Sequence, residues 1–156
     1  MKISLATEAA LAANARQAAQ RWSKLDCTPI TVGLEGELGA GKTTWARALL
    51  GGLGHTSRVP SPTFTLLEHY EIGTLTVVHL DLYRLADARE LEFLGIGDWL
   101  ALPRVWLLVE WPSRSVRFAN ALDLNIEIGI GLDEVRTLDI AARSPTGKQV
   151  LEAWFR

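Results

Sequence analysis

The sequence predicts an α/β fold with three layers, built around a mostly parallel central sheet with antiparallel hairpin additions. The first observation is an apolar run from Ile30 to Leu34, followed at once by the glycine-rich segment GELGAGKTT, residues 36–44. The second is a helical pattern that begins after this segment. The third is a pair of later apolar runs that each end in a carboxylate. A strand, a glycine-rich loop and a helix in this order are typical of a P-loop NTPase-like fold.

The glycine-rich segment fits the pattern G-x-x-x-x-G-K-[ST]. A polyphosphate only accepts hydrogen bonds, and glycines let backbone N–H groups approach it because no Cβ stands in the way. Lys42 would place a positive charge on the β- and γ-phosphates, and Thr43 would place its hydroxyl on Mg²⁺. We therefore predict a nucleotide site formed by Glu37, Leu38, Gly39, Ala40, Gly41, Lys42, Thr43 and Thr44.

Length and composition are those of a single domain, residues 1–156. Of the 156 residues, 48% are hydrophobic, which suffices for a core. A net charge of −2 argues against a broad electrostatic grip on nucleic acid. The one cysteine, Cys27, cannot form an internal disulfide and is interpreted as a small core residue. No apolar run approaches the ~18 residues of a membrane span, so we expect a cytoplasmic protein.

The N-terminal segment has some features of a secretory signal, but Glu8 interrupts its apolar stretch. An amphipathic helix that starts at Thr7 as N-cap fits better and is expected to remain part of the protein. Its apolar face would consist of Leu11, Ala15, Ala18 and Trp22.

The loop after the glycine-rich helix holds two prolines close together, which exclude regular structure there. It also holds two hydroxyls, Ser61 and Thr63. Position alone leaves two interpretations open: a plain connection, or a switch loop that senses the γ-phosphate.

Two apolar strands are each predicted to end in an acid. Residues 64–70 and 75–80 form a hairpin that turns at Gly73 and ends at Asp81, and residues 105–109 form a strand that ends at Glu110. Carboxyl ends of parallel strands meet at one sheet edge, where α/β folds place ligands. A carboxylate there can hold Mg²⁺ or orient the attacking water.

The remaining elements are read from periodicity and from Gly and Pro breaks. We expect a short helix over 87–94, a short turn over 98–103, a break at Trp111–Pro112, a hairpin of 122–130 with 135–141, and a last helix over 148–155 after Gly147.

Absent motifs favour adenine over guanine. There is no N-K-x-D segment, and no D-x-x-G follows Asp81. The three histidines do not have metal-binding spacing. His79 would share a strand face with Asp81, and we interpret it as a packed strand residue rather than a catalytic one.

The segments GELGAGKTT, VPSPTFTLLEHY, HLDLYRLADARELEFLGI and VEWP, in this order and spacing, resemble the TsaE (YjeE) family. Its members are bacterial P-loop ATPases needed for the threonylcarbamoyladenosine modification of tRNA at position 37. The resemblance covers residues 33–112 and implies a compact α/β domain and slow ATP hydrolysis. It also implies two partners, TsaB and TsaD, whose heterodimer this chain would bind and reset between turnovers by hydrolysing ATP.

The resemblance also implies roles for individual residues. Residues 37–42 would wrap the phosphates of ATP, and Thr43 would ligate Mg²⁺ with Glu110 as its carboxylate partner. Asp81 would orient water or act as base, and residues 61–63 would be the switch, so the expected catalytic residues are Lys42, Thr63 and Asp81. Trp111 would contact the nucleotide region or simply pack.

Other function classes stay open. A small-molecule kinase could use the same P-loop, although Arg84 and Arg89 are the only basic residues suitably near and no lid-length insertion exists. A nucleotide-gated binding module that barely hydrolyses ATP is a weaker alternative. Leu91, Phe93 and Trp99 are a candidate partner surface or part of the core.

Overall fold

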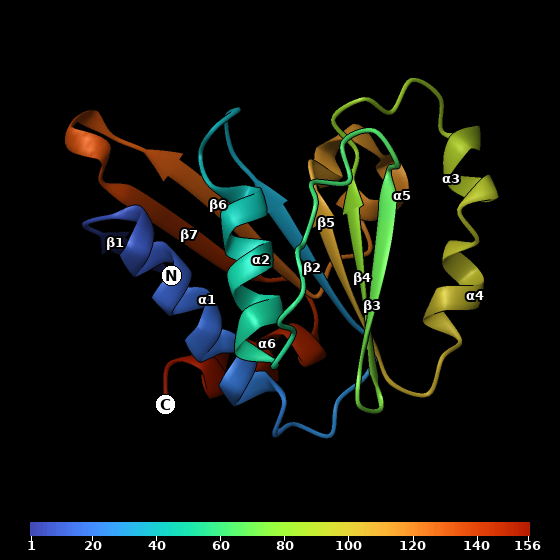
Figure 1. The fold of residues 1–156 in the computed structure, drawn as a ribbon, viewed down its shortest axis with the longest axis horizontal. Helices are drawn as coiled ribbons and strands as arrows, with labels where there is room; N and C mark the ends of the chain where they lie inside the picture. The colour runs from blue at the N-terminus through green and yellow to red at the C-terminus, as the bar shows by residue number, and fades with distance from the viewer.

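The computed structural model describes residues 1–156, which form one seven-stranded sheet with helices on both faces (Figure 1). The strands are β1 (Lys2–Leu5), β2 (Ile30–Glu35), β3 (Leu67–Ile72), β4 (Leu75–Asp81), β5 (Val105–Glu110), β6 (Leu124–Ile130) and β7 (Arg136–Ala142). The α-helices are α1 (Glu8–Trp22), α2 (Lys42–Gly52), α3 (Arg89–Phe93), α4 (Ile96–Leu100), α5 (Val116–Ala119) and α6 (Pro145–Trp154). Two 3₁₀ turns are η1 (Pro112–Arg114) and η2 (Leu132–Glu134).

The strand order is β1-β7-β6-β2-β5-β4-β3. The central strands β6, β2, β5 and β4 run parallel, whereas β3, β7 and β1 are added antiparallel at the two edges. The predicted fold class, a parallel centre with antiparallel hairpin additions, is therefore confirmed. In this order β2 lies directly beside β5, and β5 beside β4. The glycine-rich loop that follows β2 therefore lies at the same carboxyl ends of the parallel strands as the acids that end β4 and β5.

Apolar side chains on the two faces of the sheet form two cores. The larger core joins α1, α2 and α6 to the sheet, and its centre is a cluster of contacting indoles whose ring centroids lie 5.2–6.0 Å apart: Trp22, Trp45, Trp106 and Trp154. The smaller core joins α3, α4 and α5 to β4 and β5. The expected N-cap of α1 is present, since the Thr7 hydroxyl accepts a hydrogen bond from the Ala10 N–H at 3.1 Å.

The strand predicted over 64–70 begins later than expected, at Leu67. Leu66 has a positive φ of 64°, and its N–H donates to the Pro62 carbonyl at 2.7 Å, so the chain turns before the strand starts. Phe64 is consequently 81% exposed instead of facing a neighbouring strand. The proline-rich loop is thus longer than the alternation of residue types predicted.

The last helix starts earlier than expected, because Ser144 caps it, Pro145 occupies its first turn and Gly147 lies inside it. The helix predicted over 87–94 is shorter than expected, Arg89–Phe93, and the short turn predicted over 98–103 lies earlier, as the helix Ile96–Leu100. β1 and α5 were not predicted.

Cys27 is half-buried at the border of the larger core, and burial raises the pKa of its thiol.

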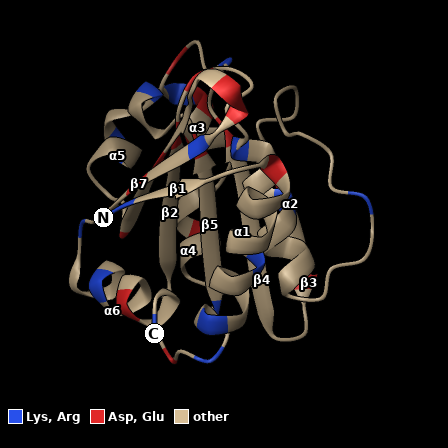
Figure 2. Ribbon diagram, turned by 90° about the vertical axis from the view of Figure 1, so that its left-hand side faces the viewer, with Lys and Arg blue, Asp and Glu red and all other residues tan.

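No helix in the structure combines the length and the apolar character needed to cross a lipid bilayer. In the view of Figure 2, basic and acidic residues are both spread over several helices, strands and loops.

Candidate functional site: a phosphate loop facing two buried acids

The glycine-rich loop between β2 and α2 adopts a backbone that its glycines make possible. Gly36, Gly39 and Gly41 have φ values of 138°, 81° and 113°, a region that side chains with a Cβ rarely adopt. At Gly36 a Cβ would also lie 2.2 Å from the Ile128 carbonyl oxygen. The loop therefore passes tightly over β6 and leads into the N-terminus of α2, whose free N–H groups favour an anion.

Lys42, the first residue of α2, is held inside this loop. Its Nζ donates hydrogen bonds to the carbonyl oxygens of Gly36 at 2.7 Å and Glu37 at 2.8 Å, and it lies 3.9 Å from the centre of the Trp111 ring. Burial lowers the pKa of Lys42, although nearby carboxylates oppose that shift. A positive charge thus lies close to the place where phosphates would bind.

The two strand-end acids lie opposite each other on neighbouring parallel strands. Asp81 of β4 is in register with Glu110 of β5, and the two residues are only 3% and 2% exposed. The Thr43 hydroxyl donates to Glu110, with distances of 2.9 Å to Oε1 and 3.1 Å to Oε2. The structure therefore brings together the hydroxyl and the carboxylate that the sequence predicted as metal ligands.

This oxygen pair suits magnesium. No group of three or more His, Cys, Asp or Glu side chains forms a complete metal cage. Mg²⁺ is commonly held by one or two protein oxygens together with substrate phosphates and water. Thr43 and Glu110 beside the phosphate loop fit that requirement.

The proline-rich loop reaches the second acid through its hydroxyls. Thr63 Oγ1 donates to Asp81 Oδ2 at 2.7 Å, and Ser61 Oγ lies 2.8 Å from Thr63 Oγ1. On its other side the loop is tied to α2, because Arg47 Nε donates to the Val59 carbonyl at 2.7 Å. The proline-rich loop is therefore hydrogen-bonded both to Asp81 at the end of β4 and to α2, the helix that follows the phosphate loop.

Most of these residues line one cavity of about 410 Å³. Its lining includes Leu38, Gly39, Gly41, Lys42, Thr43, Thr44, Thr63, Asp81 and Glu110. Two predicted nucleotide-binding residues lie elsewhere: the Ala40 side chain is buried in the larger core, and Glu37 lines a neighbouring hollow. These two residues can face the cavity only through their backbone.

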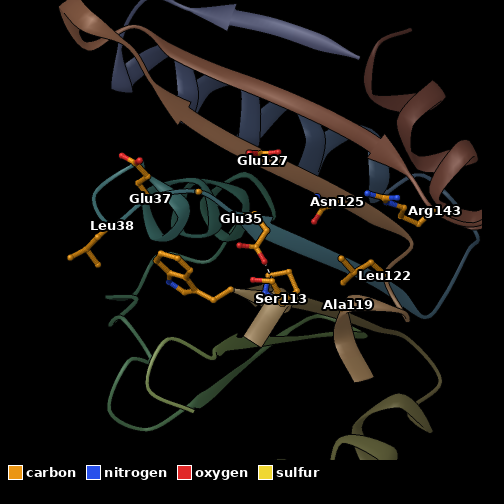
Figure 3. Close-up of a pocket in the computed structure, with 12 residues that line it drawn as sticks. Glu35, Glu37, Leu38, Ser113, Ala119, Leu122, Asn125, Glu127 and Arg143 are labelled. Atoms are coloured by element: carbon orange, nitrogen blue, oxygen red, sulfur yellow. Dashed lines mark hydrogen bonds between the residues drawn. The ribbon is translucent and has the colours of Figure 1, made fainter. Parts of the chain in front are cut away.

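Figure 3 shows that neighbouring hollow, of about 700 Å³, on the sheet face turned away from α1 and α2. It extends from Leu38 and Trp111, which also line the smaller cavity, to Arg143. Lys42 and the acids Asp81 and Glu110 do not line it. The groups suited to phosphate chemistry therefore belong to the smaller cavity.

Sequence reasoning missed several residues of the site. Glu8 and Tyr83 line the smaller cavity beside Arg84, which the sequence had indicated only as a basic residue near the site, and the Tyr83 N–H donates to Asp81 Oδ1 at 3.0 Å. His79 is fully buried, as expected of a packed strand residue, but its Nε2 also lies 2.8 Å from Glu110 Oε1. One signal in the sequence pointed to this contact: His79 lies two residues before Asp81, on the strand face that points toward the site.

The candidate partner surface is only partly exposed. Leu91 is buried and Trp99 packs against the smaller core, whereas Phe93 is 89% exposed. Phe93 is therefore the most available of the three for a contact with another protein, Trp99 is partly exposed, and Leu91 belongs to the core.

Residues 5–138 match the family model described as "Threonylcarbamoyl adenosine biosynthesis protein TsaE". A Haemophilus influenzae protein named tRNA threonylcarbamoyladenosine biosynthesis protein TsaE is 41% identical over 125 residues, which cover 80% of this chain and 78% of that protein. A Bacillus subtilis protein of the same name is 47% identical over 78 residues, covering 50% of this chain and 48% of that protein. The crystal structure of Bacillus subtilis YdiB has a TM-score of 0.77 and 28% identity, covering 100% of this chain and 94% of that one. With a family model matched along most of its length and a relative of this similarity, the chain belongs to the TsaE family.

Proposed function

We propose that this protein binds ATP and hydrolyses it slowly as an accessory protein of tRNA N6-threonylcarbamoyladenosine modification at position 37. It acts in the cytoplasm through the TsaB–TsaD heterodimer and resets that heterodimer between turnovers. The observation that carries the ATPase activity is the convergence of one lysine, one hydroxyl and two buried carboxylates on a 410 Å³ cavity beside the glycine loop. Membership in the TsaE family supports the pathway and the partners.

The phosphates of ATP bind to the N–H groups of residues 37–44 and to Lys42. On binding, the Lys42 ammonium exchanges the two loop carbonyls that it contacts in the free protein for phosphate oxygens. The N-terminus of α2 adds a favourable field for the anion. No Cβ at Gly39 or Gly41 obstructs the approach of the phosphates to the backbone.

Thr43 and Glu110 would hold Mg²⁺, which would supply positive charge to neutralise the phosphates. Asp81 orients the attacking water and accepts its proton, as a buried carboxylate facing the cavity can do. Thr63 links Asp81 to the proline-rich loop, so the position of this loop depends on what occupies the γ-phosphate site. The contacts support this division of roles, because Glu110 accepts a hydrogen bond from the Thr43 hydroxyl whereas Asp81 accepts one from Thr63 in the loop.

An accessory role agrees with the surface of the chain. The net charge of −2 and the mixed charges in Figure 2 suit a protein that works on other proteins and leaves tRNA contact to them. Exposed apolar side chains near the cavity mouth, Leu38 and Phe64, are available for such contacts.

A small-molecule kinase is the second candidate, and Arg84 at the cavity is the observation in its favour. Arg89 does not add to it, because its guanidinium lies 2.6 Å from Asp87 Oδ2 in an exposed pair. The connection between β4 and β5 consists of two short helices and carries no lid-length insertion.

The test measures phosphate release from Mg-ATP by the purified protein, alone and with TsaB–TsaD added. The proposal predicts slow turnover alone, a changed rate with the heterodimer, and ATP-dependent capture of the heterodimer in a pull-down. Fast transfer of phosphate to a small metabolite, at a rate indifferent to the heterodimer, would establish the kinase instead.

A further inference from the structure

His79 is a buried histidine that the proposed mechanism leaves without a task. It lies on β4 two residues before Asp81 and has no exposed surface. Its Nε2 lies 2.8 Å from Glu110 Oε1. A carboxylate only accepts hydrogen bonds, so Nε2 carries the proton and donates it.

Two donors from different elements hold the Glu110 carboxylate. His79 reaches Oε1 from β4, and the Thr43 hydroxyl reaches both oxygens from α2 with its shorter distance, 2.9 Å, to Oε1. Oε2 is left with the longer contact of 3.1 Å and is the less occupied oxygen. A free glutamate side chain samples several rotamers, and two fixed donors select one of them.

The Nδ1 atom of His79 indicates that packing alone does not account for a histidine at this position. His79 Nδ1 is buried and has no hydrogen-bond partner. A buried polar atom without a partner destabilises the fold relative to an apolar side chain of the same shape. The bond to Glu110 is the one polar contact that the ring makes, so that contact is the reason for a histidine here.

We propose that His79 is a positioning residue for the metal carboxylate: it fixes Glu110 in the orientation that holds Mg²⁺ beside Thr43. This inference rests on the proposed function, in which Glu110 binds the metal. Loss of an outer hydrogen-bond partner of a metal-binding carboxylate typically weakens metal binding by about 10–100-fold.

The test is a Mg²⁺ titration of ATP binding by calorimetry on wild type, His79→Phe, which keeps a ring but no donor, and His79→Gln, which keeps a donor. His69→Phe, the same change at an exposed position on β3, is the matched control. We expect His79→Phe to need about 10–100-fold more Mg²⁺. Its affinity for ATP without metal should stay at the wild-type value, and His79→Gln should recover most of the loss.

Wild-type Mg²⁺ dependence in His79→Phe, or equal losses in His79→Phe and His79→Gln, would overturn the inference. If ATP binding by the wild-type protein did not depend on Mg²⁺, both the proposed role of Glu110 and the inference on His79 would be overturned. A ¹⁵N NMR spectrum of the wild-type imidazoles gives a second measurement that requires no variant. It should show the His79 proton on Nε2, and a proton on Nδ1 alone would contradict the proposed contact.

Discussion

In the function proposed above, Lys42 would change partners when a nucleotide binds. In the free protein its ammonium contacts two loop carbonyls and the face of Trp111. A carbonyl oxygen carries a partial charge, whereas a phosphate oxygen is anionic, so the exchange strengthens each hydrogen bond. The aromatic face stabilises the cation before ATP arrives and keeps the side chain near its later position.

Replacing Lys42 by alanine should weaken ATP binding by about 2–3 kcal/mol, roughly 30–150-fold, because the variant lacks a charge-assisted contact to phosphate. Calorimetric titration of ATP measures this difference directly. Lys148→Ala, on α6, is the control and should bind ATP like wild type. Equal affinities of the Lys42→Ala variant and wild type would remove Lys42 from the site.

ATP affinity should also fall with rising pH, starting below the range in which an exposed lysine loses its proton. Burial lowers the pKa of Lys42. Phosphate binds the charged form of the lysine, so above this pKa the side chain must take up a proton when ATP binds, and the affinity falls. Titrations between about pH 7 and pH 10 would show the loss. In Lys42→Arg binding is weaker but its dependence on pH should be flat, because a guanidinium keeps its charge. A flat profile in wild type would contradict the expectation.

Asp81→Asn should keep ATP binding and lose hydrolysis. The amide has nearly the shape of the carboxylate but cannot take a proton from water, and a general base contributes about 10²–10⁴-fold to a rate. Single-turnover phosphate release measures the effect, with Asp87→Asn at an exposed site as control. Turnover at the wild-type rate in Asp81→Asn would exclude Asp81 from the mechanism.

At the scale of elements, the site depends on how one helix begins and how two strands end. The N-terminus of α2 follows a loop that only glycines can form, and the acids end strands whose other residues are buried. These features are local, so the sequence predicted them: a glycine pattern and a continuous apolar run each act within a few residues. The start of β3 was mispredicted because alternation continued through a stretch that turns at Leu66.

The N-terminus of α6 is docked tightly against the segment between α5 and β6. A Cβ at Gly147 would lie 1.8 Å from the Asp123 carbonyl oxygen, so Gly147→Ala should displace the helix and destabilise the protein by about 1–3 kcal/mol. Gly51→Ala in α2 is the matched change, because a Cβ at Gly51 meets nothing within 4 Å. That variant should gain about 0.5–1 kcal/mol. Urea denaturation gives both values, and equal effects of the two substitutions would contradict this account of the packing.

At the scale of the whole molecule, parallel pairing brings distant segments to one edge. The sheet order places the phosphate loop after β2, Glu110 at the end of β5 and Asp81 at the end of β4 on adjacent strands, although 67 positions separate Thr43 from Glu110. The general rule for open α/β sheets was enough to predict that these residues meet. It was not enough to predict the contact of His79 with Glu110, which depends on the exact register of β4 and β5.

The parts that sequence reasoning missed depend on distant partners. β1 exists because Lys2–Leu5 pairs with β7, more than 130 positions along the chain, and four residues carry too little periodicity to show this. The walls of the cavity likewise come from separate segments, since Glu8 begins α1 and Tyr83 and Arg84 follow β4. Local patterns predict which groups do chemistry, and tertiary packing decides which residues surround them.

A crystal structure with Mg²⁺ and a non-hydrolysable ATP analogue tests the central claim most directly. The account predicts the triphosphate wrapped by the backbone of residues 37–44, with Lys42 on the β- and γ-phosphates and Mg²⁺ between Thr43 and Glu110. A triphosphate bound in the larger hollow of Figure 3, or anywhere away from the glycine loop, would contradict it.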